Sequence, residues 1–443
     1  MDIDLKTIKN VHFVGIGGIG ISAIARMFLL EGKNVTGQDM QDSGIVHELQ
    51  KSGAKIIIGQ SYENIPSDTE LIVYTIAIET YDTKLFEYIK NGNIKSCSYP
   101  EMLGIVTKQK YTIAISGTHG KTTTTGMIAE ILLGNQKDPT VIIGSLLIDK
   151  DGNKTNFIAG DSSLFVVEAC EYRRSFLNIN PKVVVITNID EDHLDYYKDI
   201  EDIKSAFKEL AMKVPADGFV VCDPLDENIS DVIKGIKAKV MNYTDFLNPV
   251  TRLKIPGIHN KSNAAAAFTV ASILAISYTN ANSALGEFPG TWRRFEYKGE
   301  LLNGTLVYDD YAHHPAEIKA TLQGFRELYA KENGWAITVI FQPHLFSRTK
   351  LLLPDFAKSF EGADMVIVLP IYYAREEDDG TISSKILAEK INEAGTKAES
   401  FSDFKTAEDY MKVWLPKMNE KDIMITMGAG EAFKIGDSLL KIQ

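Results

Sequence analysis

The sequence predicts an α/β protein of three domains, and three observations support this. Two glycine-rich loops, at residues 15–20 and 117–120, each lie between an apolar strand-like segment and a helix-like segment. Apolar segments and helix-periodic segments then alternate to the end of the chain, which is typical of doubly wound sheets. A chain of 443 residues is long for a single hydrophobic core. We expect a Rossmann-like domain at residues 1–107, a central P-loop-type domain at 108–285 and a C-terminal doubly wound α/β domain at 286–443.

The composition is that of a soluble globular protein with an acidic balance. The chain is 44% hydrophobic and carries a formal net charge of −12, which argues against unspecific binding to nucleic acid or to an anionic membrane. Its three cysteines (Cys97, Cys170 and Cys222) form no metal or disulfide pattern. The apolar run at 11–25 is broken by glycines and follows an acidic N-terminus, so it predicts neither a signal peptide nor a membrane span. We expect a cytoplasmic protein without an obligate protein partner.

The first glycine loop belongs to a predicted βαβ unit. A strand is expected at 11–14, a helix up to Leu30 and a second strand at 34–37, with an acid, Asp39, just past its end. This G-x-G-x-x-G arrangement suits a diphosphate, because glycines admit phosphate oxygens and the helix start attracts them. The same physics serves NAD or UDP, and a tight turn without a ligand is the third reading. The predicted cradle consists of Gly15, Gly17, Gly18, Ile19 and Gly20, flanked by His12 and Asp39.

The second glycine loop predicts a site for nucleotide phosphates in the central domain. It follows the apolar segment 111–115 and reads G-x-x-G-K-T, which departs from a standard P-loop because Ile115 stands where that motif has its first glycine. Lys121 can reach the β- and γ-phosphates, and Thr122 offers a hydroxyl to Mg²⁺. The alternative is a strand-to-helix turn with a chance lysine. The predicted phosphate-binding residues are Gly117, Thr118, His119, Gly120, Lys121, Thr122 and Thr123.

Acidic side chains follow two further apolar strands of the central domain. The strand at 164–167 ends in Glu168, where a Mg²⁺ ligand is expected beside a phosphate loop. The strand at 183–186 is followed by an acidic loop that contains His193. A lone histidine is usually an ordinary surface or core residue, but the position of His193 in an acidic loop past a strand end favours a functional role. We expect Thr122 and Glu168 to hold the metal.

The two loops and four later motifs resemble those of the Mur ligases, which build the peptide of bacterial peptidoglycan. The later motifs are T-N-I-x-x-D-H at 187–193, G-x-H-N-x-x-N at 257–263, G-x-x-R-R-F-E at 290–296 and D-D-Y-x-H-H-P at 309–315. Together with F-Q-P-H at 341–344, they are most similar to those of the members that add L-alanine. The resemblance covers all three predicted domains in order.

This resemblance implies that ATP, with Mg²⁺, activates the lactyl carboxylate of UDP-N-acetylmuramate as an acyl phosphate, which the amine of L-alanine then attacks. The first domain would hold the UDP-sugar, the central domain ATP and the last domain the amino acid. The implied catalytic residues are Lys121, Glu168, His193 and Arg348, and the resemblance implies that His193 joins Thr122 and Glu168 as a ligand of Mg²⁺. Further implied nucleotide contacts are His259, Asn260, Asn263, Arg293, Arg294 and Asp309. The implied amino-acid site consists of Tyr311, His314, His344 and Arg348.

The chain departs from the family pattern at two places. Residues 168–174 read E-A-C-E-Y-R-R, where many alanine-adding members read E-A-D-E-S-D. Leu345 follows His344 where many relatives have a further arginine, and we expect L-alanine to remain the preferred substrate.

Three rival functions remain open at this stage. A recycling ligase would attach a preformed L-alanyl tripeptide to the same sugar. A nicotinamide-dependent oxidoreductase would use the first glycine loop but leave the second without a role. A nucleotide sensor of the same fold would bind ATP without turnover.

Overall fold

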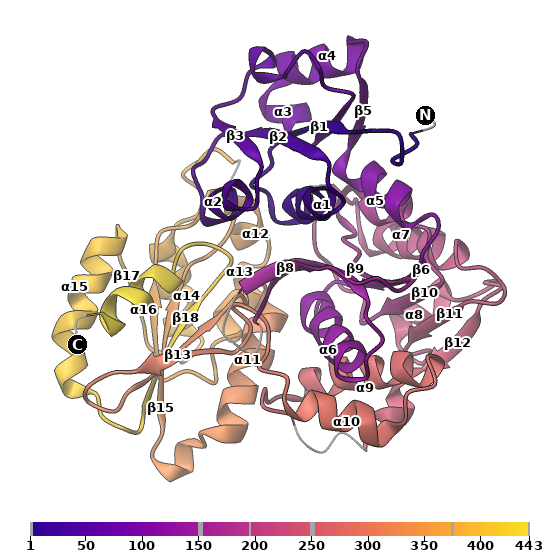
Figure 1. The fold of residues 1–443 in the computed structure, drawn as a ribbon. Helices are drawn as coiled ribbons and strands as arrows, with labels where there is room; N and C mark the ends of the chain where they lie inside the picture. The colour runs from indigo at the N-terminus through magenta and orange to yellow at the C-terminus, as the bar shows by residue number, and fades with distance from the viewer. Residues whose placement is uncertain (1–2, 149–153, 195, 249–252, 374–375, 442–443) are drawn as a thin grey trace. The chain divides into compact units, whose positions relative to one another are not determined.

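The computed structural model describes residues 3–148, 154–194, 196–248, 253–373 and 376–441 (Figure 1). The chain divides into two compact units. The first unit comprises Met1–Arg252 and Ser262–Phe288, and the second comprises Leu253–Lys261 and Pro289–Gln443. Among the described residues, no helix combines the length and the apolar character that crossing a bilayer requires.

The first unit begins with a Rossmann-like sheet of five parallel strands in the order β3-β2-β1-β4-β5. Its strands are β1 (Asn10–Val14), β2 (Asn34–Asp39), β3 (Lys55–Ile58), β4 (Leu71–Tyr74) and β5 (Lys95–Ser98). Its helices are α1 (Ile19–Leu30), α2 (Gly44–Lys51), α3 (Ile78–Tyr81), α4 (Thr83–Asn91) and α5 (Tyr99–Thr107), with the 3₁₀ turn η1 at Tyr62–Asn64. The order reverses at β1, so the first glycine loop lies at a topological switch point, where α/β sheets bind ligands.

The same unit contains a seven-stranded sheet in the order β12-β11-β10-β6-β9-β7-β8. Only its edge strand β8 runs antiparallel to its neighbour. Its strands are β6 (Tyr111–Ser116), β7 (Thr140–Ile148), β8 (Lys154–Ile158), β9 (Leu164–Glu168), β10 (Val183–Ile186), β11 (Phe219–Cys222) and β12 (Lys239–Asn242). Helical segments between and after them are α6 (Lys121–Gly134), η2 (Tyr172–Asn178), α7 (Ile200–Met212), α8 (Glu227–Val232), η3 (Tyr243–Phe246), α9 (Ile258–Ile273) and α10 (Tyr278–Gly286). Helix α9 is part of this unit only from Ser262 onward, and its first residues belong to the second unit.

The second unit contains a six-stranded sheet in the order β13-β14-β18-β15-β16-β17, with only β13 antiparallel. Its strands are β13 (Glu296–Glu300), β14 (Leu306–Asp310), β15 (Ala336–Phe341), β16 (Met365–Val368), β17 (Ala398–Ser400) and β18 (Asp422–Met427). Its helices are α11 (Pro315–Leu328), α12 (Phe346–Leu351), α13 (Leu353–Lys358), α14 (Ser384–Glu393), α15 (Phe404–Trp414) and α16 (Phe433–Leu440), with the turns η4 (Lys331–Asn333) and η5 (Leu415–Lys417).

One hydrophobic cluster joins the first two sheets. It contains Phe13 and Phe28 from the first sheet and its helix, and Phe176 and Phe207 from the central part of the chain. Asn156 of β8 adds a polar link, because its amide nitrogen donates to Ser22 Oγ at 2.7 Å and to the carbonyl of Ile19. The three sheets confirm the predicted α/β fold class, while the predicted domain limits at 107 and 285 remain predictions.

Candidate active site

The second glycine loop has a backbone conformation that requires glycine at two positions. Gly117 has φ +135° and Gly120 has φ +82°, values that side chains with a Cβ rarely adopt. A Cβ at Gly117 would lie 2.0 Å from Thr187 Oγ1, and one at Gly120 would lie 2.5 Å from Asn263 Oδ1. Lys121 then begins α6. The glycine loop therefore leads directly into a helix start, the kind of structure at which proteins bind phosphate.

Lys121 is held in this loop by a buried carboxylate. Its Nζ lies 3.0 Å from both carboxylate oxygens of Glu171 and also donates to the carbonyls of Gly117 at 2.5 Å and Thr118 at 3.0 Å. Only 14% of the lysine side chain and 3% of the glutamate side chain are exposed. Burial disfavours the charge on Lys121, but the Glu171 carboxylate outweighs it and raises the pKa of Lys121 to about 12. The sequence reasoning did not include Glu171 among the site residues.

Glu168 and Thr122 meet next to the phosphate loop. Thr122 Oγ1 donates to Glu168 Oε1 at 3.1 Å, and the backbone N–H of Gly144 donates to Glu168 Oε2 at 2.9 Å. A Cβ at position 144 would lie 2.6 Å from the glutamate oxygen, so a glycine there keeps the approach to the carboxylate open. A carboxylate and a hydroxyl are the hard oxygen ligands that Mg²⁺ prefers, so this pair fits a magnesium site.

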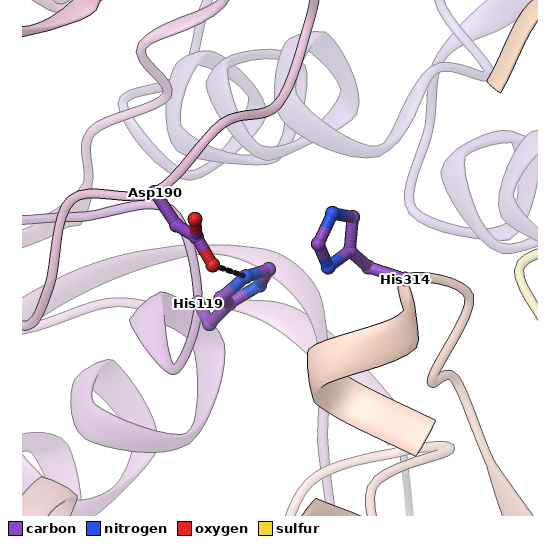
Figure 2. A group of neighbouring side chains, drawn as sticks. All are labelled: His119, Asp190 and His314. Atoms are coloured by element: carbon purple, nitrogen blue, oxygen red, sulfur yellow. Dashed lines mark ion pairs between the residues drawn. The ribbon is translucent and has the colours of Figure 1, made fainter. Parts of the chain in front are cut away.

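The loop after β10 packs on the phosphate loop. The Asn188 side chain accepts from the backbone N–H of His119 at 2.9 Å, and Thr118 Oγ1 accepts from the N–H of Asp190 at 2.8 Å. His119 Nε2 lies 3.6 Å from Asp190 Oδ2, as the dashed line in Figure 2 shows. His314, also drawn there, belongs to the second unit and is described with it below.

His193 approaches the same buried carboxylate as Lys121. Its Nε2 lies 3.7 Å from Glu171 Oε1, and its ring packs 4.8 Å from that of Tyr172. Its φ is +54°, a conformation that costs about 1–3 kcal/mol for a non-glycine residue and recurs at functional sites. Thr123, the remaining residue of the predicted phosphate site, is buried in the first turn of α6.

The first glycine loop is hydrogen-bonded to Asp39, the acid at the end of β2. Asp39 Oδ2 accepts from the backbone N–H of Gly17 at 2.8 Å, and Gly15 has φ +76°. Gly18 is the N-cap of α1, whose first residue is Ile19. A Cβ at Gly20 would lie 2.5 Å from the ring of Tyr99. The close packing of this loop against Tyr99 and its backbone conformation at Gly15 therefore require glycines.

His12 lies within the first sheet. It is 1% exposed, with Nδ1 2.9 Å from Thr36 Oγ1 and Nε2 3.2 Å from the Gln38 amide. Burial lowers the pKa of His12 to about 4, so the ring is neutral at pH 7. Gln60 also lies near this loop, because its Nε2 is 4.0 Å from the position that a Cβ of Gly15 would take. Its Oε1 is buried and has no hydrogen-bond partner among the described residues.

The two arginines of the R-R-F-E motif have different surroundings in the second unit. Arg293 is 2% exposed and binds Asp309 at 2.7 Å, Gly428 O at 2.6 Å and Gly430 O at 2.8 Å. Burial raises the pKa of Asp309, although Arg293 lies beside it. The side chain of Arg294 is 26% exposed, lies 3.7 Å from Glu317 and covers the ring of Tyr311 at 5.0 Å.

The residues predicted to hold the amino acid lie past the ends of β14 and β15. Arg348 Nη1 is 3.4 Å from His344 Nδ1, and the His344 ring stacks on Tyr372 at 5.5 Å. His313, which the sequence reasoning did not select, joins the two groups, because its ring lies 5.3 Å from Tyr311 and 5.9 Å from His344. His314 has a structural contact as well, since its Nδ1 accepts from Ala316 N at the start of α11.

The predicted adenine segment is divided between the two units. His259 and Asn260 belong to the second unit. There, burial and then Arg294 lower the pKa of His259 to about 4, and Asn260 Nδ2 donates to Pro256 O at 2.6 Å. Asn263 belongs to the first unit, where its Oδ1 accepts from Thr124 at 3.2 Å.

Three family models match consecutive parts of the chain. The Mur ligase family catalytic domain matches residues 10–111, the Mur ligase middle domain residues 115–248, and the Mur ligase glutamate ligase domain residues 293–430.

Similar proteins match over the full length. A UDP-N-acetylmuramate–L-alanine ligase of Clostridium kluyveri is 40% identical, with 99% of this chain and 100% of the relative covered. A relative of the same name from Acetivibrio thermocellus is 41% identical, with coverage of 99% and 97%. Among solved structures, a UDP-N-acetylmuramate–alanine ligase from Thermotoga maritima is 26% identical, with a TM-score of 0.78 over 98% of both chains. A murein peptide ligase from Psychrobacter arcticus, at 23% identity and a TM-score of 0.68 over 98% of both chains, is similar in fold.

Proposed function

Because the chain belongs to the Mur ligase family, we propose that it joins L-alanine to the lactyl carboxylate of UDP-N-acetylmuramate at the expense of ATP. This reaction makes a precursor of peptidoglycan in the cytoplasm. The full-length relatives that are 38–41% identical bear the name of this activity. The observation that carries the chemistry is the assembly of Lys121, Thr122 and Glu168 around one glycine loop.

The central part of the first unit would bind and activate ATP. The loop N–H groups and Lys121 bind the phosphates and stabilise the charge on the phosphoryl group while it is transferred to the carboxylate. Thr122 and Glu168, with His193, would hold Mg²⁺, which supplies further neutralisation of phosphate charge when it is bound. Asn263, His259 and Asn260 would contact the adenine. Their donor and acceptor groups suit a purine edge.

Of the two adjacent arginines, Arg294 is the better candidate for the nucleotide. Arg293 already donates to Asp309 and to two backbone carbonyls, so it and Asp309 would act by fixing the loop at Gly428–Gly430. Arg294 keeps a partly exposed guanidinium, which can pair with a phosphate.

The UDP-sugar would bind to the N-terminal part of the chain, and L-alanine would bind to the C-terminal part. The diphosphate of the UDP-sugar would lie on the loop of Gly15, Gly17, Gly18, Ile19 and Gly20, with Asp39 and His12 as its flanking residues. The carboxylate of L-alanine would pair with Arg348, and its amine and methyl groups would face His344, Tyr311 and His314. A guanidinium binds a carboxylate through two parallel hydrogen bonds, which orients a small zwitterion.

The amine substrate provides the direct test of this function. We expect phosphate release from ATP and UDP-N-acetylmuramate to require L-alanine, with glycine and L-serine used less well, because one methyl group contributes only about 1–3 kcal/mol of discrimination. Arg348→Ala should lower kcat/KM for L-alanine about a hundredfold, since a buried substrate carboxylate loses its charge partner. Lys350→Ala, on the same helix and pairing with Asp379 at the surface, is the control and should be unimpaired. Preference for the L-alanyl tripeptide would instead identify a recycling ligase, and unimpaired Arg348→Ala would place the carboxylate elsewhere.

Metal dependence tests the proposed ligands separately. Glu168→Gln should raise the Mg²⁺ concentration for half-maximal activity about tenfold or more, because a neutral amide is a weaker ligand for a hard cation than a carboxylate. His193→Ala should shift it in the same direction. Mg²⁺ titration of the initial rate at saturating ATP measures both effects. Glu191→Gln, an exposed acid of the same loop, is the control, and an unchanged Mg²⁺ requirement in both variants would contradict the assignment.

A further inference from the structure

Glu171 is a buried acid for which the proposed reaction provides no role so far. It lies three residues beyond Glu168, and only 3% of its side chain is exposed. Both of its carboxylate oxygens are 3.0 Å from the ammonium of Lys121. With the carbonyls of Gly117 and Thr118, they surround the ammonium with oxygen atoms. Lys121 is therefore already paired with an anion in the place where a phosphate would be bound.

The fold fixes the position of this carboxylate. The carbonyl of Glu171 accepts hydrogen bonds from Tyr197 Oη at 2.5 Å and from the N–H of Arg174 at 2.9 Å. Arg173 and Arg174, two and three residues further along the chain, have φ values of +52° and +55°. Two consecutive residues in this conformation persist only where their surroundings enforce it. The hydrogen bonds and the backbone conformation of the loop thus hold Glu171 next to Lys121. A flexible contact at the surface would need neither of them.

We propose that Glu171 is a positioning residue that substitutes for nucleotide phosphate on Lys121 while the site is without nucleotide. The proposal rests on the proposed function, because it requires the Lys121 loop to bind phosphates. A carboxylate resembles a phosphate in carrying a negative charge on oxygens that accept from an ammonium. An incoming phosphate must therefore compete with Glu171 for Lys121.

The same competition favours a nucleotide that carries a divalent cation. Once Lys121 turns to the phosphates, the buried Glu171 carboxylate loses its counterion, and an unpaired buried charge is costly. His193 lies 3.7 Å away, and both side chains would then face the cation that accompanies the nucleotide. Glu171 consequently penalises binding of the metal-free nucleotide more than binding of the magnesium complex.

Calorimetric titration of the whole protein with ADP, in EDTA and in Mg²⁺, tests this inference without turnover. Glu171→Gln should bind metal-free ADP about tenfold more tightly than wild type, because the phosphates no longer compete with a carboxylate for the ammonium of Lys121. The gain in affinity from Mg²⁺ should shrink by a similar factor. In a Lys121→Ala background the Glu171→Gln gain should largely disappear, because no ammonium is then released. Glu171→Asp keeps the charge but shortens the side chain by one methylene, so its affinity for metal-free ADP should lie between those of wild type and Glu171→Gln. This variant replaces Glu171→Gln in the test if the glutamine variant does not fold.

Glu227→Gln makes the same charge change on an exposed side chain at the start of α8 and should leave both titrations unchanged. Weaker ADP binding by Glu171→Gln in both buffers would show a purely structural ion pair and would overturn the proposal. An equal gain with and without Lys121 would reduce the role of Glu171 to general repulsion and would also overturn it. Wild-type protein that binds no ADP would overturn the proposed nucleotide site itself. Normal ADP binding by the wild type, with the same affinity in Glu171→Gln, would overturn only the role proposed for Glu171.

Discussion

Lys121→Ala is expected to lower the turnover of L-alanine, UDP-N-acetylmuramate and ATP by about a thousandfold or more. The reason is that Lys121 is the cation of the proposed phosphate loop, and removing one preorganised partner of transition-state charge typically costs this much. Initial rates of phosphate release, with the three substrates saturating, measure the effect. A variant that retains more than a few per cent of wild-type turnover would contradict the assignment of the loop.

The structure also predicts that Lys121→Ala is less stable than the wild-type protein. A lysine in a polar loop outside the core would leave the fold unaffected, but Lys121 is paired with the buried Glu171. Removing one partner of a buried ion pair leaves an uncompensated charge, which costs about 3–5 kcal/mol. Lys121→Ala should therefore lower the unfolding midpoint, and Lys121→Ala/Glu171→Gln should regain most of that stability while remaining inactive. Recovery of turnover in the double variant would falsify the catalytic role of Lys121.

Arg293→Met is expected to destabilise the second unit by about 3–5 kcal/mol, because it leaves Asp309 buried without its counterion. The loop carbonyls of Gly428 and Gly430 lose their donor as well. All three tryptophans of the chain, Trp292, Trp335 and Trp414, belong to this unit. Tryptophan fluorescence during denaturant unfolding therefore measures the stability of the second unit selectively.

Arg294→Met is the matched control for this experiment. The Arg294 side chain is 26% exposed and its Nη1 lies 3.7 Å from Glu317 Oε1, so this pair is longer and more accessible to water than that of Arg293, and its loss should cost less. It should change the unfolding midpoint little but weaken ATP binding. Arg293→Met/Asp309→Asn should recover part of the stability lost in the single variant, because the unpaired charge is gone. Equal destabilisation by Arg293→Met and Arg294→Met would show that the buried Arg293–Asp309 pair contributes no more to stability than the more exposed pair of Arg294.

The sequence by itself determined the fold class and the central part of the candidate site. The strand, glycine loop and helix pattern at 111–133 predicted β6 and α6, and the pattern at 11–30 predicted β1 and α1. These features are local, since an apolar strand, a turn that needs glycine and a helix start are specified within some 20 residues. Because parallel strands end at one edge of a sheet, Glu168 was also predicted beside Thr122.

Only the tertiary structure decided how the side chains within these motifs are paired. Arg293 and Arg294 are equivalent in sequence, yet the fold buries the first against Asp309 and leaves the second partly exposed. Glu171 reads as one more loop acid until the packing of the loop after β9 brings it to Lys121, 50 residues away. Burial and ion pairing depend on contacts between residues that are distant along the chain, and no local pattern encodes them. The sequence therefore specified which segments are candidates for binding phosphate, and the tertiary structure specified which of the charged side chains are paired with one another.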